Sequence, residues 1–232
     1  MVEIANDLAE LYDGYFPDNP WESTKNALAA RDSVDVIVRL AGSTLGSVVD
    51  VGAGDGVVTR EIHERKIASR ITALEISSSG IRKIEALRIA SAVTRFDGYS
   101  IPFGDKAFDT AVCSHVVEHV EHERLFLREV GRVARRCVFV VPLEGGLRGR
   151  VDRQMGHINY YSPMTFHNLI ETSNLRVLSE SVFPCSSDYE KHLAGKLKGS
   201  IRAKIRRANS LVFGSAAPHF MNYIMAVLCE SS

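Results

Sequence analysis

The sequence carries no excess of charge of either sign. Lys plus Arg and Asp plus Glu each total 28 among 232 residues. Dedicated nucleic-acid-binding proteins usually show a large basic surplus, so nucleic acid is not an expected partner. No apolar run approaches the roughly 18 residues of a membrane-spanning helix, so we expect no transmembrane segment. The acidic start does not resemble a secretory signal, and a cytoplasmic protein is expected.

Cysteine is scarce, and its spacing does not fit the common metal motifs. The four cysteines lie far apart, and no two of them form a CxxC pair. A zinc site normally needs several Cys or His residues at close, repeated spacing. We therefore expect no metal, and we interpret these residues as buried free thiols: Cys113, Cys137, Cys185 and Cys229.

Length and composition fit one globular domain. Apolar residues make up 45% and charged residues 24% of the chain, which are ordinary values. Short β-branched runs alternate with helical patterns, which predicts an α/β protein with a parallel sheet. Strands are expected at 47–51, 70–75, 92–96, 108–113, 137–142, 176–183 and 222–229. Helices are expected at 23–40, capped by Ser23, and at 81–87, 125–133, 163–173 and 188–207.

A glycine-rich loop follows the first predicted strand. Gly52, Gly54 and Gly56 form a GxGxG pattern, Asp50 precedes it, and Val57 opens a helix. Glycines allow the tight turn and let a ligand approach the main chain, and the helix start offers free N–H groups. Dinucleotide-binding folds use GxGxxG instead, so a nicotinamide-dependent oxidoreductase is disfavoured. A purely structural turn is the alternative interpretation of the loop alone.

This strand, loop and preceding acid resemble those of class I S-adenosylmethionine-dependent methyltransferases. The resemblance covers about residues 48–142 and includes a Glu-His pair after the fourth strand, as in the small-molecule group. It implies a doubly wound, mostly parallel seven-stranded Rossmann-like sheet with a terminal antiparallel strand and helices on both faces. It also implies S-adenosylmethionine as cofactor, with S-adenosylhomocysteine as product.

The same resemblance assigns a set of cofactor-binding residues. The loop and Asp50 would hold the amino-acid end, Glu75 would accept from the ribose hydroxyls, and Asp97 would accept from the adenine amino group. Two acids at the expected spacing after the loop favour a cofactor site over a structural turn. The full set is Asp50, Gly52, Ala53, Gly54, Gly56, Glu75, Ile76, Asp97, Gly98, Ser114 and His115.

Three histidines are candidates for a catalytic base. Methyl transfer mainly needs alignment of donor and acceptor, but a hydroxyl acceptor also has to lose its proton. His115 follows the fourth strand at the sheet edge where α/β folds bind ligands. His119 and His157 are the other candidates. A structural role remains the alternative for His119, and for residues 156–163 the alternative is a helix start with its tyrosines packed beneath it.

The chain is expected to form a single domain over 1–232, with three parts. These are an N-terminal helical lid (1–45), the cofactor-binding core (46–143) and a substrate-side half (144–232) with a basic helical insert at about 188–207. Four aromatics would form the lid: Tyr12, Tyr15, Phe16 and Trp21. The basic insert presents either a solvated face or a contact with an anionic substrate, a phosphorylated carrier or a membrane surface.

The sequence predicts methyl transfer to an oxygen or nitrogen of a small molecule. A sugar or secondary metabolite is favoured, and an anionic or carrier-linked acceptor is included. Two alternatives keep the same fold: a nucleic-acid methyltransferase and a non-catalytic binding protein. The Asn/Asp-Pro-Pro-Tyr/Phe motif of many nucleic-acid enzymes is missing after the fourth strand, where residues 114–117 read Ser-His-Val-Val. Both a monomer and a homodimer fit the sequence.

Overall fold

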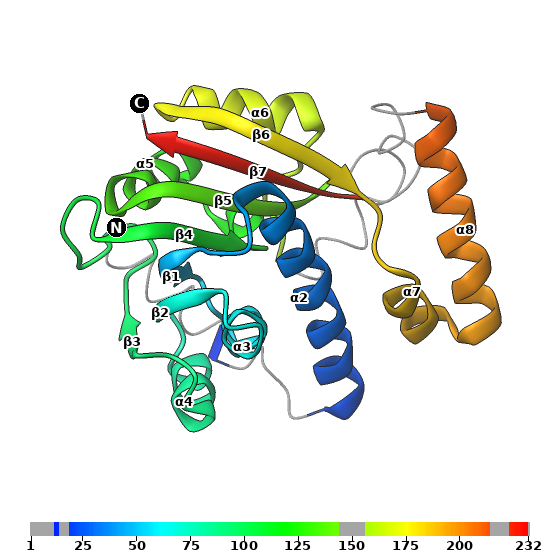
Figure 1. The fold of residues 1–232 in the computed structure, drawn as a ribbon, viewed down its shortest axis with the longest axis horizontal. Coiled ribbons are helices and arrows are strands. Elements are labelled where there is room, and N and C mark those ends of the chain that lie inside the picture. Colours follow the sequence, from blue (N-terminus) through cyan, green and yellow to red (C-terminus); the bar gives the residue numbers. More distant parts are fainter. Residues whose placement is uncertain (1–11, 14–18, 144–155, 214–222, 232) are drawn as a thin grey trace.

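A seven-stranded sheet organises the chain (Figure 1). The computed structural model describes residues 12–13, 19–143, 156–213 and 223–231. The strand order is β3-β2-β1-β4-β5-β7-β6. All pairs among β1 to β5 are parallel, and β7 runs antiparallel to both β5 and β6. The predicted fold class is confirmed, and β7 lies between β5 and β6.

The strands match the predicted ones to within a few residues at each end. They are β1 (Gly46–Val51), β2 (Ala68–Glu75), β3 (Ala92–Arg95), β4 (Phe108–Ser114), β5 (Ala134–Leu143), β6 (Leu175–Phe183) and β7 (Tyr223–Ser231). The helices are α2 (Pro20–Ala41), α3 (Val57–Glu64), α4 (Ser78–Leu87), η1 (Val117–His119), α5 (Glu123–Val133), α6 (Pro163–Glu171), α7 (Ser187–Ala194) and α8 (Lys196–Phe213).

Helices cover both faces of the sheet because alternate strand residues point to opposite sides. Val49 of β1 belongs to the core formed with α5 and α6, where Phe126 and Phe166 are fully buried. Its neighbour Val48 belongs to the core formed with α2 and α3, together with Ile37. Near-continuous apolar strands are therefore required, and this is why they could be recognised in the sequence.

Two helical predictions need correction. The helix α2 begins at Pro20, because the Asn19 side chain accepts a hydrogen bond from the Trp21 amide and Pro is well suited to the first turn. Ser23 therefore lies inside the helix. The basic stretch is two helices, because Gly195 adopts a φ of 80° between α7 and α8. Such left-handed backbone ends a helix readily at glycine.

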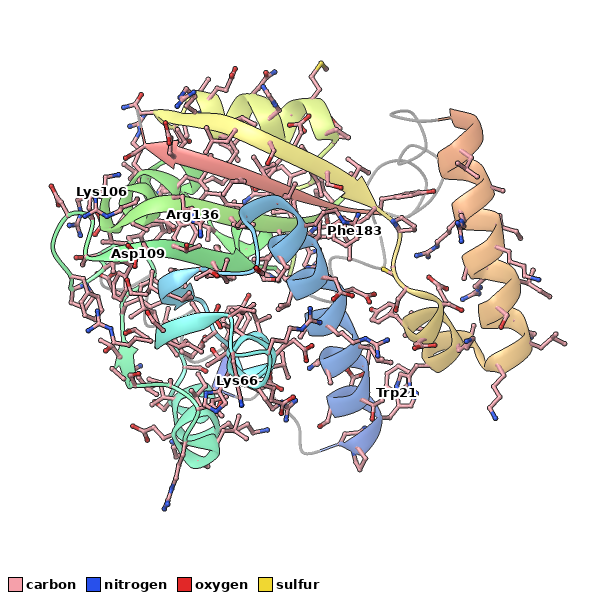
Figure 2. All side chains as sticks on the ribbon, in the orientation of Figure 1. Trp21, Lys66, Lys106, Asp109, Arg136 and Phe183 are labelled. Atoms are coloured by element: carbon pink, nitrogen blue, oxygen red, sulfur yellow. The ribbon has the colours of Figure 1, made fainter. Side chains whose placement is uncertain are left out.

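Polar contacts join the strand ends at the amino-terminal edge of the sheet, where Figure 2 labels Arg136 and Asp109. The Arg136 guanidinium donates to Thr110 Oγ1 at 2.9 Å and to the carbonyls of Ala41 and Thr44, each at 2.8 Å. Asp109 accepts from both the amide and the hydroxyl of Ser47. Each of these contacts joins segments that are far apart in the sequence, so this edge holds the strand ends in register.

Among the described residues, no helix is long and apolar enough to cross a membrane.

Candidate active site

A cavity of about 430 Å³ lies at the opposite edge, where β1, β2 and β4 end. Residues from the glycine loop, η1, α2 and α7 form its walls together with the strand ends. Ligands of open α/β sheets bind at this edge. Of the proposed cofactor and catalytic residues, all line the cavity except Gly56 and Asp97.

The glycine loop takes the conformation that its sequence requires. Gly52 has a φ of 75°, and a Cβ there would lie 2.5 Å from Val116 Cγ2. Gly56 has a φ of 82° and is the N-cap of α3, where it lies against α4 rather than in the cavity wall. A larger residue would be strained at either position.

Two buried carboxylates stand behind the loop. Glu75 Oε2 accepts from the Gly54 amide at 2.8 Å, and Oε1 accepts from the Ser77 amide at 3.0 Å. Asp50 is 1% exposed and accepts from the Thr59 hydroxyl at 2.6 Å. Burial raises the pKa of Asp50 to about 6 and also raises that of Glu75. A cation in the cavity would relieve this cost by stabilising the charged forms.

Asp97 lies outside the cavity lining. Its side chain is exposed, and Oδ1 accepts from the amides of Tyr99 and Ser100 at 2.9 and 2.6 Å. This Asx-type turn shapes the loop after β3. Ile76 and Gly98 lie beside it in the cavity wall. The assignment of Asp97 to an adenine amino group stays a prediction that requires its second oxygen.

His115 is held in an unusual backbone conformation at the end of β4. Its φ is 57°, while its amide donates to Val140 O at 2.8 Å. Such strain in a non-glycine residue is typical of functional positions. Nδ1 lies 3.3 Å from Glu118 Oε1, and Nε2 is buried with no hydrogen-bond partner among the described residues. Ser114 Oγ is in the same state.

Glu118 is the carboxylate that sequence reasoning missed as a site residue. It is 1% exposed, although a buried carboxylate is costly without a partner. Burial opposes its ionisation, but the contact with His115 and the charges of His115 and His119 outweigh burial and lower its pKa. The two residues are three apart in the sequence, but their contact depends on the left-handed backbone at His115, just before η1, so spacing alone did not reveal it.

His119 and His157 pack edge to face, with ring centroids 4.8 Å apart. His119 Nδ1 lies 3.0 Å from the carbonyl of Gly156, so this nitrogen carries the proton and Nε2 is left as an acceptor. Burial lowers the pKa of His119. Ligand atoms of Glu118, His119 and His157 lie within 4.8 Å of one another, a grouping that sequence spacing did not suggest.

The segment after Gly156 combines the two alternatives that the sequence left open. His157 is 8% exposed and lines the cavity, whereas Tyr161 is buried in the core and donates to Glu123 Oε1 at 2.6 Å. Ser162 caps α6 with a reciprocal capping box. His157 therefore faces the cavity, whereas Tyr161 packs beneath α6.

The helices α2 and α7 form one wall of the cavity. Tyr12 lines the cavity, while Trp21 is 45% exposed and stacks on His192 of α7 at 4.9 Å. Tyr15 and Phe16 lie outside the described residues. Arg206 of α8 lines the cavity too, and its ion pair with buried Glu190 measures 2.6 Å. Sequence reasoning took Arg206 only as part of a charge run.

The predicted free thiols are present, with one difference. Cys113, Cys137 and Cys229 are buried, whereas Cys185 is half-buried and lines the cavity.

Comparison with known proteins identifies the family. A family model described as a methyltransferase domain matches residues 21–180. The chain belongs to this methyltransferase family. The match extends well beyond residues 48–142, to which the sequence resemblance was limited, and includes α2 and most of β6. Membership of the class I S-adenosylmethionine-dependent methyltransferases is thereby confirmed.

A curated relative and two solved structures are similar to this chain. An O-methyltransferase, resE, from Aspergillus sclerotiorum is 30% identical over 129 residues, which cover 53% of this chain and only 48% of the relative. Geranyl diphosphate C-methyltransferase from Streptomyces coelicolor A3(2), in complex with S-adenosyl-L-homocysteine, has a TM-score of 0.62 at 14% identity, covering 87% of this chain and 75% of that one.

The [4+2]-cyclase SpnF has a TM-score of 0.63 at 16% identity, covering 87% of this chain and 80% of that one. At such low identities these structures show the shared fold alone. Because a cyclase and methyltransferases share the fold, the reaction has to be argued from the side chains of the cavity.

Proposed function

We propose that this methyltransferase moves the methyl group of S-adenosylmethionine to an oxygen or nitrogen of a small molecule. The observation that carries the proposal is the single cavity that the glycine loop and Glu75 share with His115 and His157. A methyl donor bound by the glycine loop and Glu75 would face an acceptor bound beside His115 and His157. Proximity of this kind accounts for much of the rate enhancement in group transfer.

The residues present fit the cofactor in charge and in hydrogen bonding. Glu75 receives one backbone hydrogen bond on each oxygen, so each oxygen keeps a lone pair for a ribose hydroxyl. Asp50 and the start of α3 suit the ammonium and carboxylate of the amino-acid end. Ser33 Oγ and Ser114 Oγ line the cavity and have no hydrogen-bond partner among the described residues, so a ligand would satisfy them.

His115 is the base that the geometry favours. When bound, S-adenosylmethionine would supply a sulfonium-activated methyl carbon, whose C–S bond would break as the lone pair of the acceptor forms the new bond. The acceptor would have to reach His115 Nε2, which is buried in the structure, and this nitrogen would take the proton from the acceptor hydroxyl or amine. Glu118, at 3.3 Å from Nδ1, keeps the proton on Nδ1 and stabilises the imidazolium that results. Glu118 is therefore a positioning residue.

The acceptor side of the cavity favours a compact molecule with both apolar and polar parts. Pro142, Leu193 and Ile224 supply apolar surface, and Tyr189 and Arg206 supply polar groups. Arg206 is already paired with Glu190, so an anionic acceptor would meet a largely compensated charge. A neutral hydroxyl compound is the favoured acceptor, in line with the name of the fungal relative. We place this activity in the cytoplasm, as the sequence suggests.

The test starts with the cofactor. Isothermal titration calorimetry should give micromolar binding of S-adenosylhomocysteine, and Glu75→Ala should weaken it about 100-fold, since two hydrogen bonds to a charged group are lost. Glu85→Ala, on the exposed face of α4, is the matched control and should bind normally. Unchanged binding in Glu75→Ala would refute the site assignment.

Methyl transfer is then assayed with methyl-labelled S-adenosylmethionine and a panel of sugars, phenols and amines. Labelled product is expected with at least one hydroxyl or amine compound. Tight cofactor binding with transfer to RNA or DNA alone would replace the small-molecule proposal by the nucleic-acid alternative. Binding with no transfer to any acceptor would favour a non-catalytic role or a reaction of another kind on this fold.

A further inference from the structure

The outer face of α8 exposes large apolar side chains. Leu197 is 76% exposed, Ile201 49%, Ile205 52% and Leu211 81%. Their spacing puts them on one side of the helix, within a stripe about a third of its circumference. Single exposed apolar residues are ordinary, but a continuous stripe on a helix usually marks a contact surface.

Exposed basic residues border this stripe, with Lys196 and Arg207 on one side and Lys198 and Arg202 on the other, and Lys204 lies within it. The helix contains no Asp or Glu between Lys196 and Phe213. Its cations are Lys196, Lys198, Arg202, Lys204, Arg206 and Arg207, and all except Arg206 are exposed. Although the chain as a whole has no net charge, this helix is the most strongly basic segment of the described residues.

The inner face of α8 is fixed to the rest of the molecule. Gly199 packs so closely on α7 that a Cβ would lie 2.4 Å from Glu190 O. Arg206 pairs with Glu190, and Tyr223 of β7 donates to Arg206 O at 2.7 Å. These contacts determine which face points outward, and Figure 1 shows α8 at the margin of the molecule beyond α7.

We propose that α8 docks the protein on an anionic lipid surface. An apolar stripe bordered by Lys and Arg suits a helix that lies in the plane of the membrane interface, with its apolar side among the acyl chains and its cations at the headgroups. Negatively charged lipids complement the five exposed cations, which a neutral protein partner would not. Docking would place α8 between the lipid and the cavity wall formed by Leu193 and Arg206.

Vesicle flotation tests the proposal without requiring any methyl acceptor. The full chain should float with vesicles of phosphatidylcholine and phosphatidylglycerol in equal amounts. It should bind pure phosphatidylcholine vesicles at least about 10-fold more weakly. High salt should reduce binding to the anionic vesicles, because screening weakens the headgroup contacts.

Two variants separate the apolar and charged contributions. Leu197→Ser with Ile201→Ser should weaken binding to anionic vesicles at least about 10-fold, since both exposed side chains would otherwise be buried in lipid. Lys198→Gln, Arg202→Gln and Lys204→Gln together should weaken it about 100-fold. The control is Leu125→Ser with Met164→Ser, which removes two exposed apolar side chains from α5 and α6 and should leave binding unchanged.

Each variant is checked for its binding of S-adenosylhomocysteine, which should match the wild type because none of the changed residues lines the cavity. If the wild type does not bind S-adenosylhomocysteine, the proposed function is refuted, and the result on lipid binding is unaffected. The lipid proposal is wrong if the wild type ignores anionic vesicles or if the apolar variant binds them normally. Light scattering tests the alternative that α8 is a dimer interface. If the wild type is a dimer, the apolar variant is a monomer and neither binds vesicles, the lipid proposal is wrong.

Discussion

The two edges of the sheet use polar residues in opposite ways. At the amino-terminal edge, Arg136 and Asp109 have their hydrogen-bonding groups engaged by neighbouring segments. At the carboxyl-terminal edge, Ser114 Oγ and His115 Nε2 are buried and have no partner in the described part of the chain. A folded protein tolerates buried unpaired groups mainly where a ligand completes them. The amino-terminal edge therefore contains residues that stabilise the fold, and the carboxyl-terminal edge contains residues available to bind a ligand.

The largest effect is expected for the catalytic base. His115→Ala should lower kcat/KM about 100- to 1000-fold once an acceptor is known, because proton transfer by a positioned side chain contributes that much. Cofactor binding should change far less, and added imidazole should restore part of the activity. If His119→Ala has the larger effect, the assignment of the base moves to His119. Activity that is lost on chelation and restored by zinc would instead reveal a metal at Glu118, His119 and His157.

Arg136→Met should have the largest effect on stability. It removes three hydrogen bonds that tie β5 to β4, to the last residue of α2 and to the segment after α2, so the free energy of unfolding should fall by about 2–4 kcal/mol. Urea unfolding measures the change. The affinity for S-adenosylhomocysteine should remain that of the wild type, and a parallel loss of affinity would show that the two edges are not independent.

Asp50→Asn should change how stability depends on pH. The pKa of Asp50 is raised to about 6 in the folded state, so its stabilising contribution is present below about pH 4 and is lost as pH rises through about 6. The loss is on the order of 2–3 kcal/mol. Asn does not titrate, so the melting temperature of this variant should fall less over that interval in the absence of ligand.

At the other edge of the sheet, Asp109→Asn should change the dependence of stability on pH in the opposite direction. Hydrogen bonds from Ser47 lower the pKa of Asp109, so its contribution is present above the unfolded pKa and is lost as pH falls. The variant should therefore be less stable than the wild type at neutral pH, and this difference in stability should shrink as the pH falls. Equal pH profiles for the two variants would contradict the contrast between the edges.

The smallest effect is expected for Ser114→Ala. Because its buried hydroxyl has no partner among the described residues, removal should change the free energy of unfolding by less than about 0.5 kcal/mol. The affinity for S-adenosylhomocysteine should fall by no more than about 10-fold, as expected for one hydrogen bond. Denaturant unfolding and calorimetry give the two values, and a clear loss of stability would mean that Ser114 supports the fold.

The sequence predicted the sheet well because parallel strands buried on both faces are nearly continuous apolar runs. It also predicted the glycine loop, since Gly52 and Gly56 meet a backbone requirement that few other residues meet. The pairing of His115 with Glu118 was beyond it, because that contact depends on the left-handed turn at His115. The inward turn of Arg206 was also hidden, since a charge pattern does not reveal which side of a helix packs.

The position of β7 between β5 and β6 has a consequence for how the protein folds. Among the strands that the structure describes, β6 pairs only with β7, so it cannot join the sheet until the later strand has left the ribosome. β7 also brings Tyr223 and Ile224 to the cavity. During synthesis, β1 to β5 can therefore assemble while β5 exposes an open edge, a state prone to mispairing. The glycine loop forms early in this order, and the acceptor side of the cavity is completed last.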